Sequence, residues 1–368
     1  MAMDSGAVLQ GVKISRVGAG AVPARAGLMT QPRRILPGRS WMITRRATRR
    51  HFLFRPDEDR TSQCIYWYVT AVMAEKFGIE LHAVQVLSTH IHEVLTDTRG
   101  ELPAFLRERN RLLANALKQH RGWPEEVFQR APANYVELLG VDALLKQIGY
   151  TLANCVEAGL VNHPGEWPGV TVSADDIGRH VVEVERPRVY FDPKNRNWPA
   201  RARLPISMPR ELNEAYAERA PAVLRAAVDA AVARARALAR EAGYTVGAVA
   251  KLLSVPFTER ATSAEPARQR QPTFATGGDR GRAKEAWCEL SAFRELYRKA
   301  LAALKAGQRY EFPRGTWRWC KELLPAATLG QESAPTDTSQ RSSMSVAAAT
   351  ALGRMPAPTV LLTAGTTG

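Results

Sequence analysis

The stretch 84-VQVLSTHIHEVLTD-97 carries two of the chain's seven histidines, with one isoleucine between them. Polar and apolar residues alternate through 79–87 and 89–97 around a tight turn near Ser88, which predicts a pair of antiparallel strands. Successive side chains of a strand point to opposite faces, so His90 and His92 should share one face. Two imidazoles one pleat apart can bind one metal ion if another element supplies a third ligand. The alternative is a pair of half-exposed histidines hydrogen-bonded to water.

Further strands and helices flank this strand pair. The segment 39-RSWMITRRATRRHFLF-54 predicts a strand that bends into a basic loop, and 61-TSQCIYWYVTAVMAEKF-77 predicts a helix. Helices are also predicted around 101–120 and over 141–158, the second of which is stopped by Gly159. The order strand, helix, strand, strand, helix, helix predicts an α+β fold, in which helices cover one face of an antiparallel sheet.

The predicted helix 141–158 has two kinds of surface. Tyr150 and Asn154 lie one turn apart, on the same face as Gln147, so a hydroxyl nucleophile and an amide oxygen project together. The alternative is an ordinary amphipathic helix with a polar side. The apolar residues form a separate stripe, which consists of Val141, Leu144, Leu145, Ile148, Leu152 and Val156.

Three motifs in order resemble a known family. His90-Ile91-His92 matches the histidine–hydrophobe–histidine signature of HUH endonucleases. The segment 148-IGYTLANCVEAGLVNHPGEWPGVTV-172 is similar to the tyrosine helix of REP-associated tyrosine transposases, where Asn follows Tyr by four residues, before a V-x-A-G-L-V exit and a Trp-Pro pair. The opening 40-SWMITRRATRRHFLFRPDEDR-60 is also similar to the start of that family. The resemblance covers about residues 35–175.

The resemblance implies both a fold and a chemistry. The fold is the HUH endonuclease fold, with a ferredoxin-like or RRM-like antiparallel sheet. Tyr150 would attack a phosphodiester of single-stranded DNA beside a hairpin, giving a 5′-phosphotyrosine link and a free 3′-OH. His90, His92 and Asn154 would hold a divalent metal, Mg²⁺ or Mn²⁺, that polarises the phosphate. The family includes dimers as well as monomers, so the resemblance is compatible with a homodimer.

The sequence departs from the family pattern at two places. The residue after the histidine pair is usually apolar, but here it is Glu93. Glu93 should point at the covering helices, where an unpaired carboxylate is costly. Either Glu93 pairs with an arginine, for which Arg107 is one possibility, or the strand ends early. The family's Tyr-Ile-His-Leu-Asn-Pro pattern appears as 150-YTLANC-155, which keeps the ligand position and loses the proline.

Two basic segments are candidates for DNA binding. The arginine-rich loop after the first predicted strand suits phosphate contacts near a hairpin, and 186–203 mixes arginine with aromatic residues, which stack unpaired bases. The alternatives are a solvated basic turn and a linker that drapes over the first domain. The candidate DNA-binding residues are Arg45, Arg46, Arg49, Arg50, Arg186, Arg188, Tyr190, Lys194 and Arg196.

Composition narrows the class of protein. The chain has 51 Lys and Arg against 36 Asp and Glu, a formal net charge of +15, which favours a polyanionic partner such as nucleic acid. Its four cysteines are far apart, without the spacing of a zinc site, and suit a reduced cytosol. No apolar run reaches the roughly 18 residues of a membrane span, and no signal-peptide pattern opens the chain. We therefore expect a cytoplasmic protein with no membrane partner.

The texture of the sequence changes along the chain. Residues 1–31 and 326–368 contain no aromatic residue, and Met29 is a candidate start. The stretch 236–256 has the rhythm of a helix-turn-helix unit. The expected organisation is a disordered or non-native extension over 1–31, a catalytic domain over 32–175, a basic linker over 176–210, a mostly helical C-terminal region with a DNA-binding candidate over 211–325, and a disordered tail over 326–368.

Three functions remain open from the sequence. The first is a metal-dependent transposase with a tyrosine nucleophile, which cleaves and transfers single-stranded DNA. The second is a catalytically inactive or domesticated nucleic-acid-binding protein on the same fold. The third is an unrelated metal-dependent hydrolase that uses His90 and His92, in which Tyr150 is dispensable. The lack of further His, Asp or Glu at ligand spacing near the pair argues against the third.

Overall fold

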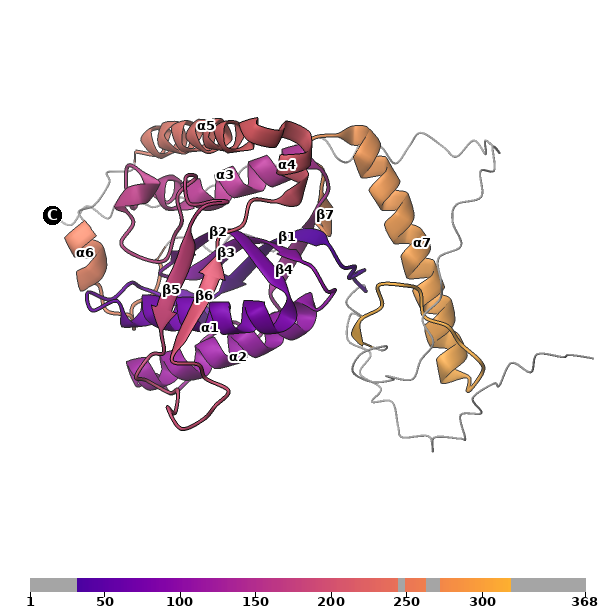
Figure 1. Cartoon of the computed structure of the whole chain (residues 1–368), viewed down its shortest axis with the longest axis horizontal. Helices are drawn as coiled ribbons and strands as arrows, with labels where there is room; N and C mark the ends of the chain where they lie inside the picture. Colours follow the sequence, from indigo (N-terminus) through magenta and orange to yellow (C-terminus); the bar gives the residue numbers. More distant parts are fainter. Residues whose placement is uncertain (1–31, 244–248, 263–271, 319–368) are drawn as a thin grey trace, which may run out of the picture. The chain divides into compact units, whose positions relative to one another are not determined.

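The computed structural model describes residues 32–243, 249–262 and 272–318 (Figure 1). The expected N-terminal extension 1–31 and the expected tail 326–368 lie outside the described residues, as does the turn of the expected helix-turn-helix unit at 244–248. Within the described ranges, no helix is long and apolar enough to cross a membrane.

The central sheet has five strands in the order β2-β3-β1-β4-β7. The strands β2, β3, β1 and β4 pair antiparallel with their neighbours, and this order matches the ferredoxin-like βαββαβ pattern. The short strand β7 (Phe274–Ala275) pairs in parallel with β4, so the sheet is mixed rather than purely antiparallel. The elements of the pattern are β1 (Arg39–Arg46), α1 (Thr61–Phe77), β2 (Ile79–Leu87), β3 (His90–Asp97), α2 (Leu102–Arg121) and β4 (Asn134–Leu138).

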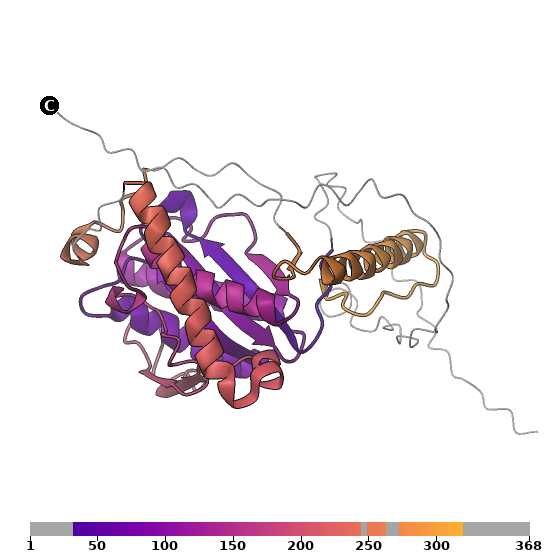
Figure 2. The same ribbon diagram turned by 90° about the horizontal axis from the view of Figure 1, so that it is seen from above.

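Helices cover both faces of this sheet, so the expectation of a single covered face is wrong. The helices α1 and α2 lie on one face, and α3 (Val141–Glu157) lies on the other, beneath α5 (Ala220–Glu241) (Figures 1 and 2). Most of the apolar stripe of α3 is buried, and its Val141 and Leu145 are half-buried. Gly149 permits close contact with α5, because a Cβ there would lie 3.0 Å from Ala231 Cβ and 3.2 Å from Ala227 O. The second face is thus covered by α3, and α5, from outside the predicted α+β segment, packs on the far side of α3.

The expected basic linker 176–210 contains a hairpin. Strands β5 (Val181–Glu185) and β6 (Arg201–Pro205) pair antiparallel, and β6 contacts α1. The loop between them is fastened as well, since Phe191 is buried and its ring lies 5.1 Å from that of Tyr68 on α1. This geometry agrees with the alternative in which the segment drapes over the first domain.

The C-terminal region is mostly helical where it is described. Pro221 stands in the first turn of α5, where a missing N–H costs nothing, so this proline begins a helix. The other helices are α4 (Arg210–Tyr216), α6 (Val249–Ser254) and α7 (Arg280–Lys305). Trp317 packs against α2, because its Nε1 donates to Glu101 at 3.3 Å and Arg107 lies 5.7 Å from its ring.

A buried ion pair lies beneath β3. Glu93 does point at the covering helices, as the strand alternation predicts, but its partner is Arg109 rather than Arg107. Both side chains are fully buried, and Arg109 Nη2 donates to Glu93 Oε2 at 2.8 Å. The Tyr66 hydroxyl also donates to Glu93. Two residues along a helix rotate a side chain by roughly 200°, which explains why Arg107 is 53% exposed instead.

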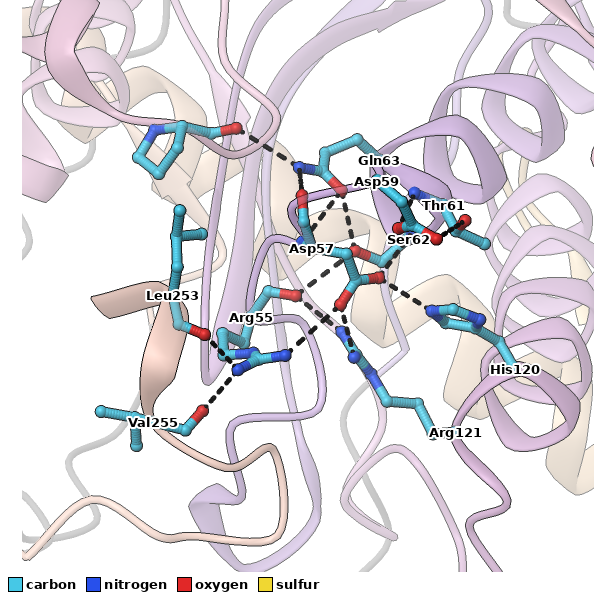
Figure 3. A network of polar contacts seen from close by, with 11 residues as sticks. Arg55, Asp57, Asp59, Thr61, Ser62, Gln63, His120, Arg121, Leu253 and Val255 are labelled. Atoms are coloured by element: carbon cyan, nitrogen blue, oxygen red, sulfur yellow. Dashed lines mark hydrogen bonds and ion pairs between the residues drawn. The ribbon is translucent and has the colours of Figure 1, made fainter. Parts of the chain in front are cut away.

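A second polar network joins α1, α2 and α6 (Figure 3). The Asp57 carboxylate accepts hydrogen bonds from His120 Nε2 at 2.8 Å, Arg121 Nη1 at 2.6 Å and the Ser62 N–H at 3.0 Å. Arg55, in the segment before α1, donates to the carbonyl oxygens of Leu253 and Val255 and so holds α6 against that segment. Burial raises the pKa of Asp57, but the His120 hydrogen bond and the Arg121 charge outweigh it and hold the pKa well below its ordinary value.

We predict that Arg109→Met lowers the free energy of unfolding by about 3–5 kcal/mol, because it leaves the Glu93 carboxylate buried without its partner. Urea unfolding followed by circular dichroism measures this loss. The matched control is Arg111→Met on the same helix, where the side chain is 54% exposed; it should change the free energy by less than about 1 kcal/mol. Equal effects of the two substitutions would contradict a special role for the buried pair.

We predict a pH-dependent effect of Asp57→Asn. The native pKa of Asp57 lies below its unfolded value, so its contribution to stability is complete above about pH 5 and is lost as pH falls below about 4. The variant should lose roughly 2–3 kcal/mol at pH 7, and its difference from wild type should shrink at pH 3. Urea midpoints at both pH values test this. Asp59→Asn is the control, since the exposed Asp59 accepts from the N–H and the hydroxyl of Thr61 and an asparagine oxygen can accept the same N–H bond.

Candidate active site

His90 and His92 lie together on the α3 face of the sheet. Their ring centroids are 4.7 Å apart, and each Nδ1 atom lies beside a threonine hydroxyl. Thr44, the cross-strand neighbour of His92 on β1, is 3.2 Å from its Nδ1. Thr89, in the turn before β3, is 2.8 Å from Nδ1 of His90. The hydroxyls fix the planes of both rings.

The helix α3 brings Tyr150 and Asn154 to the same place. Asn154 Oδ1 lies 3.2 Å from His90 Nε2, and the Tyr150 ring lies 5.5 Å from that of His92, edge to face. Asn154 also lies near enough to the Tyr150 phenol to lower its pKa. The four residues singled out from the sequence as nucleophile and ligands are therefore neighbours in space, on a strand and a helix from opposite sides of the β3–α3 interface.

Burial sets the protonation states of this centre. It lowers the pKa of His90 to about 4 and that of His92 well below its ordinary value, assisted at His92 by the His90 charge and at both by Arg46. Both imidazoles are thus neutral at pH 7, as metal ligation requires. Burial also raises the pKa of the Tyr150 phenol to about 12, and the charge of Glu157 adds to this rise. Tyr150 is therefore a phenol and not a phenolate at pH 7.

The donor set fits a divalent cation. Two ligands at about 2.1 Å from one ion and at right angles to each other lie about 3 Å apart, close to the 3.2 Å between His90 Nε2 and Asn154 Oδ1. Two imidazoles and an amide oxygen suit Mn²⁺ or Mg²⁺ with water in the remaining positions. The described residues hold no group of three or more His, Cys, Asp and Glu that could bind a metal, so the third protein ligand would be the amide of Asn154.

Gln85 is a further candidate that the sequence reasoning missed. It is fully buried and lies opposite His92 in the β2–β3 pairing. Its Oε1 accepts a hydrogen bond of 2.7 Å from the Thr171 hydroxyl, while its Nε2 finds no partner among the described residues. A buried donor without a partner costs about 1–3 kcal/mol, which makes this amide a candidate for contact with a ligand. Its cross-strand position was the available signal.

The four loop arginines have different surroundings. Arg46, exposed at the end of β1, lies opposite His90 in the β1–β3 pairing. Its charge lowers the pKa of His90, His92 and Tyr150. Arg50 also lies near enough to lower the pKa of His90. Arg49 forms an exposed ion pair of 3.2 Å with Glu125. Arg45 points to the opposite face of the sheet.

The side chain of Arg45 serves the fold. It donates to the carbonyl oxygens of Ala131 and Gln129 and lies 4.8 Å from the Phe128 ring. Burial lowers its pKa to about 10. The guanidinium is thus engaged on the α1 and α2 side of the sheet, and the structure does not bring it to the histidines. Of the four loop arginines, Arg46 and Arg50 are the ones near the centre.

The candidates of the second basic segment also lie away from the histidines. Arg186 donates to Trp198 O at 2.7 Å within its own loop, and the Tyr190 hydroxyl accepts from Asn115 on α2 at 3.1 Å. The β5–β6 loop therefore packs on the α1 and α2 side of the sheet, whereas His90 and His92 face α3, the helix that carries Tyr150. Arg188, Lys194 and Arg196 are exposed on this loop.

Two solved structures are similar to this chain. A REP-associated tyrosine transposase bound to a REP hairpin is 18% identical, covers 40% of this chain and 85% of its own, and has a TM-score of 0.33. A protein of Deinococcus radiodurans R1 thought to be a transposase is 15% identical, covers 34% of this chain and 97% of its own, and has a TM-score of 0.24. No protein-family model and no curated protein matches the sequence. Scores this low do not establish kinship.

Proposed function

We propose that this chain is a metal-dependent endonuclease and strand transferase for single-stranded DNA, with Tyr150 as the nucleophile at sites next to hairpins. The observation that supports it most is the convergence of a phenol, two neutral imidazoles and an amide oxygen from β3 and α3, with Asn154 Oδ1 3.2 Å from His90 Nε2. An arginine-rich chain of net charge +15 suits a polyanionic substrate.

The chemistry follows from the groups present. Tyr150 Oη would form a bond to phosphorus while the 3′ oxygen leaves as a hydroxyl, giving a 5′-phosphotyrosine link that conserves the energy of the broken bond for strand transfer. A phenol with a pKa of about 12 is a weak nucleophile at neutral pH. His90, His92 and Asn154 would hold a divalent cation, Mg²⁺ or Mn²⁺, which when bound polarises the phosphate. Arg46 would contact the same phosphate from beside the cation.

We predict that Tyr150→Phe abolishes covalent attachment to DNA, because no other hydroxyl replaces the phenol. The full-length protein and the variant are incubated with single-stranded hairpin oligonucleotides from the gene's flanks, with Mn²⁺ or Mg²⁺, and run on a denaturing gel. Wild type should give a slow-migrating protein–DNA band that is lost in the variant and in EDTA.

The other results of this assay separate the remaining functions. DNA retention on a native gel without any adduct, with both metals and many flanking sequences, would favour a nucleic-acid-binding protein without catalysis. Cleavage that survives Tyr150→Phe would exclude the tyrosine mechanism and favour a metal-dependent hydrolase.

We predict that Arg46→Gln weakens binding of single-stranded DNA, because it removes a cation beside His90. Loss of one phosphate contact should lower the slope of log Kd against log salt concentration by about 0.7. Fluorescence anisotropy with a labelled hairpin strand measures both quantities. Arg196→Gln is the matched control, since Arg196 is exposed on the β5–β6 loop. DNA binding weakened by Arg196→Gln and unchanged by Arg46→Gln would contradict the proposed site.

A further inference from the structure

The two histidines share a feature that the proposed reaction does not by itself require. Each Nδ1 atom lies beside a threonine hydroxyl, and the two hydroxyls come from different elements: Thr44 from β1 and Thr89 from the β2–β3 turn. Backbone pairing holds both in place, since Thr44 is the cross-strand partner of His92 and the Thr89 carbonyl accepts a bond of 2.8 Å from the Ala47 N–H. Each of the two imidazole rings thus has its own threonine hydroxyl, held beside Nδ1 by backbone pairing.

The partner of Nδ1 decides which nitrogen of a neutral imidazole carries the proton. Ligation through Nε2 needs that proton on Nδ1, where an acceptor must meet it. In the structure, however, His90 Nε2 also lies 3.2 Å from Asn154 Oδ1, and an amide oxygen only accepts. That hydrogen bond needs the proton on Nε2, so the Thr89 hydroxyl must donate to Nδ1. A hydroxyl both donates and accepts, so Thr89 satisfies either tautomer by turning its own proton.

We propose that Thr44 and Thr89 are positioning residues that hold the two imidazole rings still, Thr89 while His90 changes tautomer, and so present both Nε2 atoms to a divalent cation. The inference rests on the proposed function. In the change, the ring gives the Nε2 proton to water and takes one at Nδ1, so no net proton is released. A carboxylate at either position would impose the Nδ1–H form and add a charge, and a valine would bond neither form.

The test is a Mn²⁺ titration of the full chain without DNA, with free Mn²⁺ followed by electron paramagnetic resonance. Wild type should bind one Mn²⁺, and His90→Ala should lose it. Thr89→Val and Thr44→Val should each weaken binding about 10- to 100-fold, as loss of the hydrogen-bond partner of a ligating histidine does. Thr89→Ser and Thr44→Ser keep the hydroxyl and should stay within about threefold of wild type.

Thr151→Val is the matched control. It makes the same change in a buried threonine of α3 whose hydroxyl faces the Met42 sulfur at 3.5 Å and touches no histidine. It should bind Mn²⁺ like wild type. Imidazole ¹⁵N shifts of the valine variants should also show altered tautomer populations at His90 and His92, which a loss of packing alone would not produce.

The outcomes are distinct for the two proposals. Wild type that binds no Mn²⁺ would overturn the metal-dependent function, and this inference with it. One-to-one binding that is lost in His90→Ala and unchanged in both valine variants would overturn the inference alone. Serine variants that bind as weakly as the valine variants would also overturn it, because the hydroxyl would then not be the group that matters.

Discussion

Strand β3 meets opposite demands on its two faces, and the buried Glu93–Arg109 pair decides how the strand is turned. Glu93 faces α2, where Arg109 donates to it from both Nη1 and Nη2. Its neighbour His92 therefore faces α3. A slip of one residue in the β1–β3 pairing would exchange the faces of all these side chains. It would leave Arg109 buried without its carboxylate, at a cost of several kcal/mol, and would turn both imidazoles away from Tyr150. The ion pair on one face thus fixes the position of His90 and His92 on the other.

The tyrosine has a comparable constraint at the helix behind it. Gly149 lets α5 approach α3 closely, since any side chain there would meet Ala231 and the carbonyl of Ala227. The next residue, Tyr150, is rotated by about 100° along the helix, toward the histidines. Buried residues of α5, such as Val228 and Val232, belong to the same hydrophobic core as the sheet. The segment 32–175 therefore shares its core with residues beyond it, and the tyrosine helix is held between the sheet and α5.

The sequence was most informative where the geometry is local. Strand alternation predicted that His90 and His92 share one face, and a separation of four residues predicted that Tyr150 and Asn154 share one side of a helix. Only the family resemblance predicted that the two pairs form one site. The failures involve contacts between distant segments. The partner of Glu93 depends on which side of α2 meets the sheet. The second covered face depends on which side of the sheet α3 crosses, and the cover of α3 depends on α5, some seventy residues further along the chain. Thr44 and Gln85 belong to neighbouring strands, so only the register of the sheet shows that they adjoin His92.

Arg45 and Arg46 show how far composition can be trusted for a binding surface. They are adjacent in the sequence and looked like one basic cluster, yet a strand sends them to opposite faces. Arg45 gives its hydrogen bonds to backbone carbonyls, and burial lowers its pKa to about 10, whereas Arg46 is exposed and acts electrostatically on His90, His92 and Tyr150. A cation near a buried phenol favours its ionised form. The same charge that would attract a phosphate therefore also opposes the rise in the pKa of Tyr150, and in the proposed reaction one arginine would act on both substrate and nucleophile.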